Sequence, residues 1–220
     1  MNILAFDTTG ESCSVAIKTA EHCFEKINHE PRKQAERLLP MIDDLLVQAN
    51  LQRSDLDGLA LTHGPGAFTG VRIAIAAAQG IAYALDLPVV TVSTLAALAQ
   101  GAHRKFGWKQ VLSALDARMG EVYWGAYQAD DSGLMQSVHS DAIGSPSQVH
   151  IVDEPRTGWY GAGSGWGVYL DQLPPVNVSH VLTVEAFDII TLALPLLKSG
   201  HSLTAEEIKP VYLRNKVVRS

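Results

Sequence analysis

The sequence predicts an α/β protein built from two similar halves, and two observations lead to this expectation. Each half opens with an apolar strand that ends at an aspartate and continues through a tight turn, a glycine and a glutamate into an alternating strand; the two strings are Asp7–Glu11 and Asp116–Glu121. Alternating helices and strands follow each opening. A meander followed by helices and parallel strands, present twice, is typical of the duplicated ribonuclease-H-like fold of actin, Hsp70 and sugar kinases. We therefore expect two mixed sheets flanked by helices.

The first half is expected to span residues 1–105. Its second strand alternates, with Cys13, Val15 and Ile17 on one face, so we expect that strand to be half-buried. Ser93 or Thr94 is expected to cap the last helix, which runs to about Arg104. The other expected elements are strands at Asn2–Phe6, Ser12–Lys18, Cys23–Ile27, Asp57–Thr62 and Pro88–Val92, and helices at Gln34–Leu51 and Val71–Asp86.

The expected helix Gln34–Leu51 has an apolar stripe and two irregular positions. Met41 lies off the stripe and is expected to be an exposed apolar contact. Pro40 lacks a backbone donor, so we expect a kink or a helix restart there. The stripe consists of residues at three- and four-residue spacing, namely Ala35, Leu38, Leu39, Ile42, Leu45, Leu46 and Ala49.

The second half is expected to span residues 106–204. Its meander continues through about His139, and a capping box at Thr204–Glu207 starts a helix that Pro210 stops. A basic tail, Tyr212–Val218, follows, and the segment 205–220 is expected to pack back on the first half. The other expected elements are strands at Gln110–Leu115, Val122–Gln128 and Thr157–Gly161, a short helix at Trp166–Gln172 and a helix at Glu185–Lys198.

Composition and charge narrow the class of protein. The formal net charge is −6, whereas a protein that binds nucleic acid alone carries a positive surplus, so we expect any RNA contact to be indirect or made with a partner. Two scattered cysteines, Cys13 and Cys23, suit a reducing compartment. The most apolar segment, Val71–Leu85, contains Arg72 and is expected to be too short to span a bilayer. We expect a cytoplasmic protein without membrane contact.

A glycine-rich turn joins the strand before it to a long small-residue helix. The segment His63–Arg72 contains Gly64, Gly66 and Gly70 but no lysine, so it is not a Walker loop. Such a turn can hold a phosphate because backbone N–H groups and the helix dipole point at it. Together with Asp7 and Asp116, these glycines are the candidate nucleotide-binding residues. The alternative is that both aspartates only start turns, which their side chains do well.

Three segments of the sequence resemble the TsaB (YeaZ-type) family. They are Ile3–Thr9, Gly64–Arg72 and Pro88–Leu95, and the late Pro210–Arg214 is similar to that family's C-terminal signature. The resemblance is strong over the first half and in the tail, and weaker across about residues 130–205. It implies a role in making N6-threonylcarbamoyladenosine in tRNA, beside the anticodon. It also implies two partners, a related catalytic subunit, TsaD, and the ATPase TsaE. A second copy of the chain is a further expected partner, because an isologous dimer would place the same helix surface of two copies face to face.

The resemblance also shows where a TsaD-like protein has metal-binding histidines that this sequence does not have. In TsaD a His-x-x-x-His pair follows the corresponding strand, and two such histidines reach one metal from one helix face. Here Thr94 and Leu98 stand at these positions. No two of the eight histidines are three or four residues apart, and the glycines of Tyr160–Gly165 have no aspartate beside them. We therefore expect no catalytic residue, no metal and no cofactor in the isolated chain, with ATP bound only within a complex.

Two enzymatic alternatives are compatible with the fold class. One is an ATP-dependent carbamoyl- or phosphoryl-transferase that uses Asp7, the turn Gly64–Gly70 and Asp116. The more remote one is a metallopeptidase-like protein, which the missing histidine pair disfavours.

The helix after the glycine turn carries a stripe of mostly small side chains, Ile73, Ala76, Ala77, Gly80 and Ala84. Small residues let a second helix approach closely, so the stripe packs either on this chain's own sheet or on a partner's helix. The resemblance implies that the first two helices contact TsaD. The positions expected at this interface are Glu36, Leu39, Pro40, Met41, Asp43, Phe68, Thr69, Arg72, Ile73 and Ala76.

Overall fold

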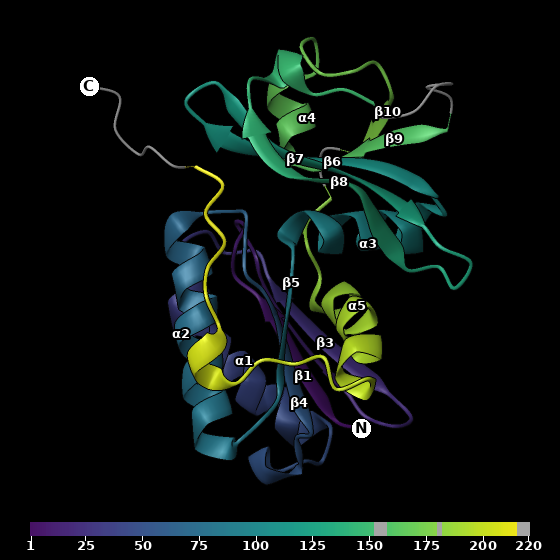
Figure 1. The fold of residues 1–220 in the computed structure, drawn as a ribbon. Helices are drawn as coiled ribbons and strands as arrows, with labels where there is room; N and C mark the ends of the chain where they lie inside the picture. Colours follow the sequence, from purple (N-terminus) through teal and green to yellow (C-terminus); the bar gives the residue numbers. More distant parts are fainter. Residues whose placement is uncertain (152–157, 180–181, 215–220) are drawn as a thin grey trace.

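The fold consists of two five-stranded mixed sheets that lie one above the other in Figure 1. The computed structural model describes residues 1–151, 158–179 and 182–214. The first sheet has the order β3-β2-β1-β4-β5, in which β1 pairs antiparallel with β2 and parallel with β4. Its strands are β1 (Ile3–Asp7), β2 (Cys13–Lys18), β3 (Cys23–Asn28), β4 (Gly58–Thr62) and β5 (Val89–Val92).

The second sheet repeats the first in both order and strand direction. Its order is β10-β9-β6-β7-β8, and β6 pairs antiparallel with β7 and parallel with β9. Thus β6 takes the place of β1, and β9 takes the place of β4. The duplicated ribonuclease-H-like fold is confirmed. The strands are β6 (Gln110–Arg118), β7 (Glu121–Ala129), β8 (Met135–Gly144), β9 (Trp159–Ala162) and β10 (Asn177–Ser179).

Five α-helices lie in the described part of the chain. They are α1 (Gln34–Gln48), α2 (Phe68–Leu85), α3 (Thr94–Phe106), α4 (Ser164–Tyr169) and α5 (Ala186–Lys198). Three short 3-10 helices, η1 (Arg53–Asp55), η2 (Pro146–Gln148) and η3 (Ala205–Glu207), complete the elements. α1 and α2 cover one face of the first sheet, and α4 lies on the outer face of the second (Figure 1).

The last helix of each half lies between the two sheets. α3 follows β5 but packs against β6, β7 and β8, whereas α5 follows β10 and packs against β1, β2, β4 and β5. The two helices also contact each other, so one hydrophobic core joins both halves through residues such as Leu98 and Ile189. The boundary expected at residue 105 separates the strands of the two sheets. However, α5, which packs on the first sheet, belongs to the part of the chain after this boundary.

The position of α5 explains why one strand prediction is wrong. β2 was expected to be half-buried, yet Cys13 to Ile17 are all buried. Cys13, Val15 and Ile17 pack toward α1, and Ala16 packs in the core between the sheets. On that same side Ser14 Oγ accepts a hydrogen bond of 2.8 Å from the backbone N–H of Ala186. A helix that arrives about 170 residues later in the chain therefore covers the face expected to be exposed.

Two predictions for α1 are also wrong. Met41 is 8% exposed and lies in the core of the first half, so it is not an exposed contact. Leu39 is 54% exposed instead, because the buried face of α1 is centred on Leu38, Ile42 and Leu45. The helix passes through Pro40 without a restart.

α2 begins three residues earlier than expected. Its first residue is Phe68, and Gly70 lies inside the helix instead of in the turn. At 18 residues the helix is long and apolar enough to cross a membrane by length and composition, so the argument that it is too short is wrong. Its buried side chains, including Val71, Ala74 and Ala78, pack in the core of the first half.

The C-terminal segment runs along the first half toward the second (Figure 1). Leu203 pairs with Val89, and the backbone N–H of Val211 donates to the carbonyl of His63 at 3.0 Å. The expected capping box forms at Thr204, but the helix it starts is the 3-10 turn η3. The expected strand start at Thr157 and the tail beyond Arg214 lie outside the described residues.

Candidate functional site

The glycine turn is filled by the loop that follows β1. An added Cβ on Gly66 would lie 2.7 Å from the carbonyl oxygen of Thr9, and one on Gly70 would lie 2.0 Å from that of Thr8. The same loop hydrogen-bonds to the turn, because Ala67 N–H donates to the carbonyl of Thr9 at 2.8 Å and Thr8 Oγ1 donates to that of Gly70 at 2.7 Å. Two of the three glycines therefore permit contact between two backbones of this chain.

Asp7 is enclosed at the centre of this packing. Its side chain is 1% exposed, and its Oδ1 accepts hydrogen bonds from Thr62 Oγ1 and from Thr9 Oγ1, the latter at 2.6 Å. Burial raises the pKa of the carboxyl above its ordinary value, although these hydrogen bonds oppose the shift. Thr9 Oγ1 also lies 3.3 Å from Thr94 Oγ1, so hydroxyl groups of this chain occupy the surroundings of the carboxylate.

Asp116 forms the same local structure in the second half. Its Oδ1 accepts a hydrogen bond of 2.8 Å from the backbone N–H of Arg118, just as Asp7 Oδ1 accepts one of 3.2 Å from Thr9 N–H. A second carboxylate oxygen of Asp116 pairs with the Arg118 guanidinium at 3.0 Å. Each aspartate thus accepts a hydrogen bond from the backbone N–H two residues later, as a residue that starts a turn does.

The glycines of the second half also serve backbone packing. Gly163, at φ +107°, would place a Cβ 2.5 Å from the carbonyl oxygen of Ala114 in β6, and Gly165 would place one 3.0 Å from it. Gly161 lies against the Trp166 ring, whose Nε1 donates to the Leu112 carbonyl at 3.3 Å. The strand-to-helix turn of each half therefore packs on the first strand of that half or on the loop after it.

The residues at the expected metal position do not fit a metal. Leu98 is 1% exposed and lies in the core between the sheets, and the Thr94 hydroxyl faces Thr9. No group of three histidine, cysteine, aspartate or glutamate side chains in the described residues could hold a metal ion. Burial lowers the pKa of His63 beside the glycine turn, and both backbone groups of this residue bond to neighbouring segments.

The small-residue stripe of α2 lies at the surface. Phe68, Thr69, Arg72 and Ala76 are exposed, Ile73 is half-buried, and a Cβ on Gly80 would meet open space. Tyr83, 76% exposed, extends the stripe toward the C-terminal end of the helix. Both interpretations of the stripe apply in part: Ile73 and Ala77 are half-buried and pack against the core of the first half, whereas Ala76, Gly80 and Ala84 are exposed.

Helix α1 lies beside α2 and adds its own exposed positions (Figure 1). Glu36, Leu39, Pro40 and Asp43 are exposed, so nine of the ten expected interface positions are exposed or half-buried and only Met41 is buried. Val47, 81% exposed, was not expected. We refer to the exposed residues of α1 and α2 together as the α1–α2 face.

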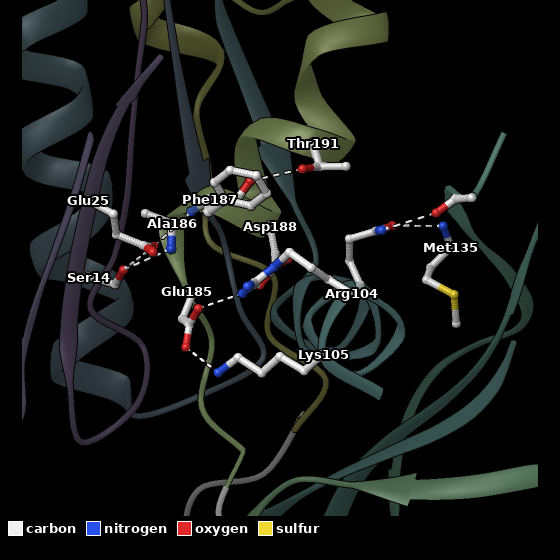
Figure 2. A network of polar contacts seen from close by, with 12 residues as sticks. Ser14, Glu25, Arg104, Lys105, Met135, Glu185, Ala186, Phe187, Asp188 and Thr191 are labelled. Atoms are coloured by element: carbon white, nitrogen blue, oxygen red, sulfur yellow. Dashed lines mark hydrogen bonds and ion pairs between the residues drawn. The ribbon is translucent and has the colours of Figure 1, made fainter. Parts of the chain in front are cut away.

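A polar cluster joins α3 to the start of α5 (Figure 2). The Arg104 guanidinium makes two hydrogen bonds to Asp188, at 2.8 and 2.9 Å, and one to Glu185 at 2.5 Å. Lys105 also pairs with Glu185. From the first sheet, Glu25 accepts a hydrogen bond of 3.0 Å from the backbone N–H of Phe187. Because α3 packs on the second sheet and α5 on the first, this cluster connects the two halves.

Comparison with known proteins decides the family. The chain is 41% identical to the tRNA threonylcarbamoyladenosine biosynthesis protein TsaB of Escherichia coli strain K12, over 99% of this chain and 96% of that protein. It is 35% identical to the TsaB of Haemophilus influenzae, over 99% of this chain and 95% of that protein. The chain belongs to the TsaB family. The family model of TsaD, tRNA N6-adenosine threonylcarbamoyltransferase, matches residues 28–155.

The solved structures agree with this assignment. YeaZ from Pseudomonas aeruginosa is 44% identical and superimposes with a TM-score of 0.92, covering 96% of this chain and 99% of that one. The predicted resemblance to the TsaB family is therefore confirmed along nearly the whole chain. It includes the region of about residues 130–205, in which the sequence motifs are weaker.

Proposed function

We propose that this chain is a non-catalytic subunit that binds a TsaD-like catalytic subunit through its α1–α2 face. The TsaB relatives are named for tRNA threonylcarbamoyladenosine biosynthesis, and the proposal assigns this chain to the same modification. A TsaE-like ATPase joins the assembly, tRNA is contacted mainly through the partners, and the work takes place in the cytoplasm. ATP binds only once the complex has formed.

The surface position of the small-residue stripe is the observation that carries the proposal. Ala76 and Gly80 are exposed on α2, whose opposite face packs in the core of the first half, and no heavy atom of the described chain would lie within 4 Å of a Cβ on Gly80. A helix that presents Ala and Gly one turn apart lets a second helix approach with backbones nearly in contact. A relative with the same fold has a corresponding helix pair, so the two would join in a pseudo-symmetric heterodimer.

The packing at the glycine turn supports a subunit without its own chemistry. A phosphate held by this turn needs free space beside Gly66 and Gly70, and the backbone of Thr8 and Thr9 occupies that space. The Asp7 carboxylate is enclosed by hydroxyl groups, and leucine stands at the second expected metal-ligand position. Each of these arrangements favours a structural role for residues that would serve catalysis in an active relative.

The test is a binding titration between this chain and a TsaD-like subunit. Ala76→Lys places a long cation in the helix contact and is expected to weaken binding at least about 100-fold, or about 2.7 kcal/mol. Ala20→Lys, in the exposed turn between β2 and β3, is the matched control and is expected to bind like the wild type. Equal affinity of the two variants would contradict the assigned face.

The enzymatic alternative, an ATP-dependent transferase, is tested by measuring ATP binding to the isolated chain. Under our proposal the isolated chain does not bind ATP and Mg²⁺ at micromolar concentration. Tight binding by the isolated wild type, lost in folded Asp7→Ala and Asp116→Ala variants, would replace the subunit reading with the enzymatic one.

A further inference from the structure

Three side chains from two distant segments form an exposed stack at the first turn of α2. The Arg72 guanidinium carbon lies 3.2 Å from the centroid of the Phe68 ring and 5.2 Å from that of the Tyr212 ring. The two rings are 6.2 Å apart. Phe68 is 60% exposed and Tyr212 is 48% exposed. We call these three residues the arginine stack.

The C-terminal segment brings Tyr212 to this position and is fixed on both sides of it. On one side, Val211 N–H donates to the carbonyl of His63 at 3.0 Å. On the other, the Arg214 guanidinium pairs with Glu121 and donates to the carbonyl of Ala117 at 3.1 Å. The tail therefore spans from the glycine turn to the Asp116 turn of the second half, and Tyr212 is held over the start of α2.

Arg72 has no acidic partner within the described chain. Its one hydrogen bond goes to the carbonyl of Phe68 at 3.3 Å, and no described carboxylate lies within 4 Å of it. The three acidic groups on the neighbouring α1 are already paired, Glu36 with Lys33 at 2.7 Å, Asp43 with Arg53 at 2.5 Å and Asp44 with Lys26 at 2.7 Å. Among the residues that the structure describes, the arginine stack is thus a cation without a counter-charge at one end of the α1–α2 face.

Stacking prepares this arginine for a particular kind of ligand. The Phe68 ring beside the Arg72 guanidinium restricts its motion. Only Nη1 donates a hydrogen bond within the described residues, so the N–H groups of Nε and Nη2 are available to a ligand. A carboxylate accepts two such N–H groups in parallel, which gives both energy and directional specificity. The stack therefore presents an oriented receptor for a carboxylate, beside a stripe in which Ala76 and Gly80 offer no polar side-chain group.

We propose that the arginine stack binds a carboxylate of the catalytic partner subunit, and that this pair selects that subunit over a second copy of this chain. The proposal rests on the function proposed above and names the polar contact of the same face. A second copy would bring the like cation Arg72, and the acidic groups within its α1, Glu36, Asp43 and Asp44, are already paired within that copy, so α1 of a second copy offers no unpaired carboxylate. The net charge of −6 makes an RNA phosphate the less favourable ligand.

The experiment measures affinity for the TsaD-like subunit at several salt concentrations. Arg72→Glu is expected to lower the affinity at least tenfold at 50 mM salt, because it reverses the charge opposite the carboxylate. Arg72→Lys is expected to lose several-fold, because a lysine keeps the charge but not the paired N–H geometry. Lys109→Glu is the matched control, because Lys109 is an exposed cation just before β6, and this variant is expected to bind like the wild type.

The salt dependence of the affinity and two variants of Tyr212 distinguish a charge contact from a merely structural effect. The wild-type affinity is expected to fall as salt rises from 50 to 500 mM, whereas the affinity of Arg72→Glu does not fall. Tyr212→Ala is expected to weaken binding about threefold and to reduce this salt dependence, and Tyr212→Phe is expected to restore both. Thermal unfolding of each variant establishes that it remains folded.

Three results would overturn the inference. The first is that the wild type binds the TsaD-like subunit and Arg72→Glu binds it with the same affinity. The second is that Arg72→Glu weakens self-association of the isolated chain, measured by sedimentation, as much as it weakens binding of the TsaD-like subunit. In that case the contact of Arg72 with a carboxylate would not select the catalytic partner over a second copy. The third is a loss of tRNA binding by the complex with unchanged protein affinity, which would assign the stack to RNA. Failure of the wild type to bind the partner at all would instead contradict the proposed function.

Discussion

Two glycines in α2 provide a prediction in which the same substitution acts in opposite directions. In an ordinary helix interior, Gly→Ala stabilises by about 0.5–1 kcal/mol because alanine loses less backbone entropy on folding. Gly80 meets this condition, since its added Cβ would contact nothing within 4 Å. Gly70 does not, since the added Cβ would lie 2.0 Å from the Thr8 carbonyl oxygen.

The magnitude at Gly70 follows from the atoms that must move. Real Cβ contacts do not fall below 3.0 Å, so the Thr8 backbone or the start of α2 has to shift by about 1 Å. Such a shift strains the buried hydrogen bonds from Thr8 Oγ1 to Gly70 and from Ala67 N–H to Thr9, each worth about 1 kcal/mol. With overpacking of about 1–3 kcal/mol and the alanine gain subtracted, we expect a net loss of about 3 kcal/mol.

The assay is thermal unfolding of the two variants beside the wild type. For a chain of this size, about 3 kcal/mol lowers the melting temperature by about 6–12 °C, whereas Gly80→Ala is expected to raise it by about 2 °C. Shifts of the same sign in Gly70→Ala and Gly80→Ala would refute the reasoning. That result would mean that the loop after β1 does not fill the glycine turn.

Two further predictions concern charged groups away from the α1–α2 face. Arg104→Ala leaves the buried Asp188 carboxylate without its two hydrogen bonds and is expected to lower the free energy of unfolding in urea by about 3 kcal/mol. Arg37→Ala, which removes the exposed pair of Arg37 with Glu30, is the control and is expected to have a much smaller effect, because solvent screens exposed ion pairs. Equal losses in the two variants would contradict the buried contact. The pKa of Asp130 is lowered to about 2 because Ser132 and Gln136 donate to its carboxylate. Its contribution to stability is therefore present above pH 3.8 and lost as the pH falls toward 2, and an NMR titration midpoint near 3.8 would refute this.

Local signals in the sequence predicted local structure well. The two aspartate turns revealed the duplication, because each half repeats the same short string and needs no partner to do so. Ser93 or Thr94 was expected as a helix cap, and the cap is Ser93, whose Oγ accepts hydrogen bonds of 3.1 and 3.4 Å from Leu95 and Ala96. These predictions depend on residues a few positions apart, where the chemistry of a side chain determines the conformation of the backbone next to it.

Contacts between distant segments could not be read from the sequence. A helix was expected at Glu185–Lys198, but its sequence does not show that it covers β2 and the rest of the first sheet. Gly70 was assigned to the glycine-rich turn between strand and helix, whereas it lies inside α2, where the approach of Thr8 excludes a side chain. Tyr212 was part of a basic tail, and only the fold brings it beside Phe68, 144 positions earlier in the chain.

The most direct test of the central claim is a reconstituted tRNA modification assay. Formation of N6-threonylcarbamoyladenosine is measured with the TsaD-like and TsaE-like subunits, the activated substrate, and this chain as wild type, Ala76→Lys, Ala20→Lys or omitted. We expect modification with the wild type and with Ala20→Lys, and little with Ala76→Lys or without the chain. Equal modification when the chain is omitted would contradict the account, as would full activity of Ala76→Lys.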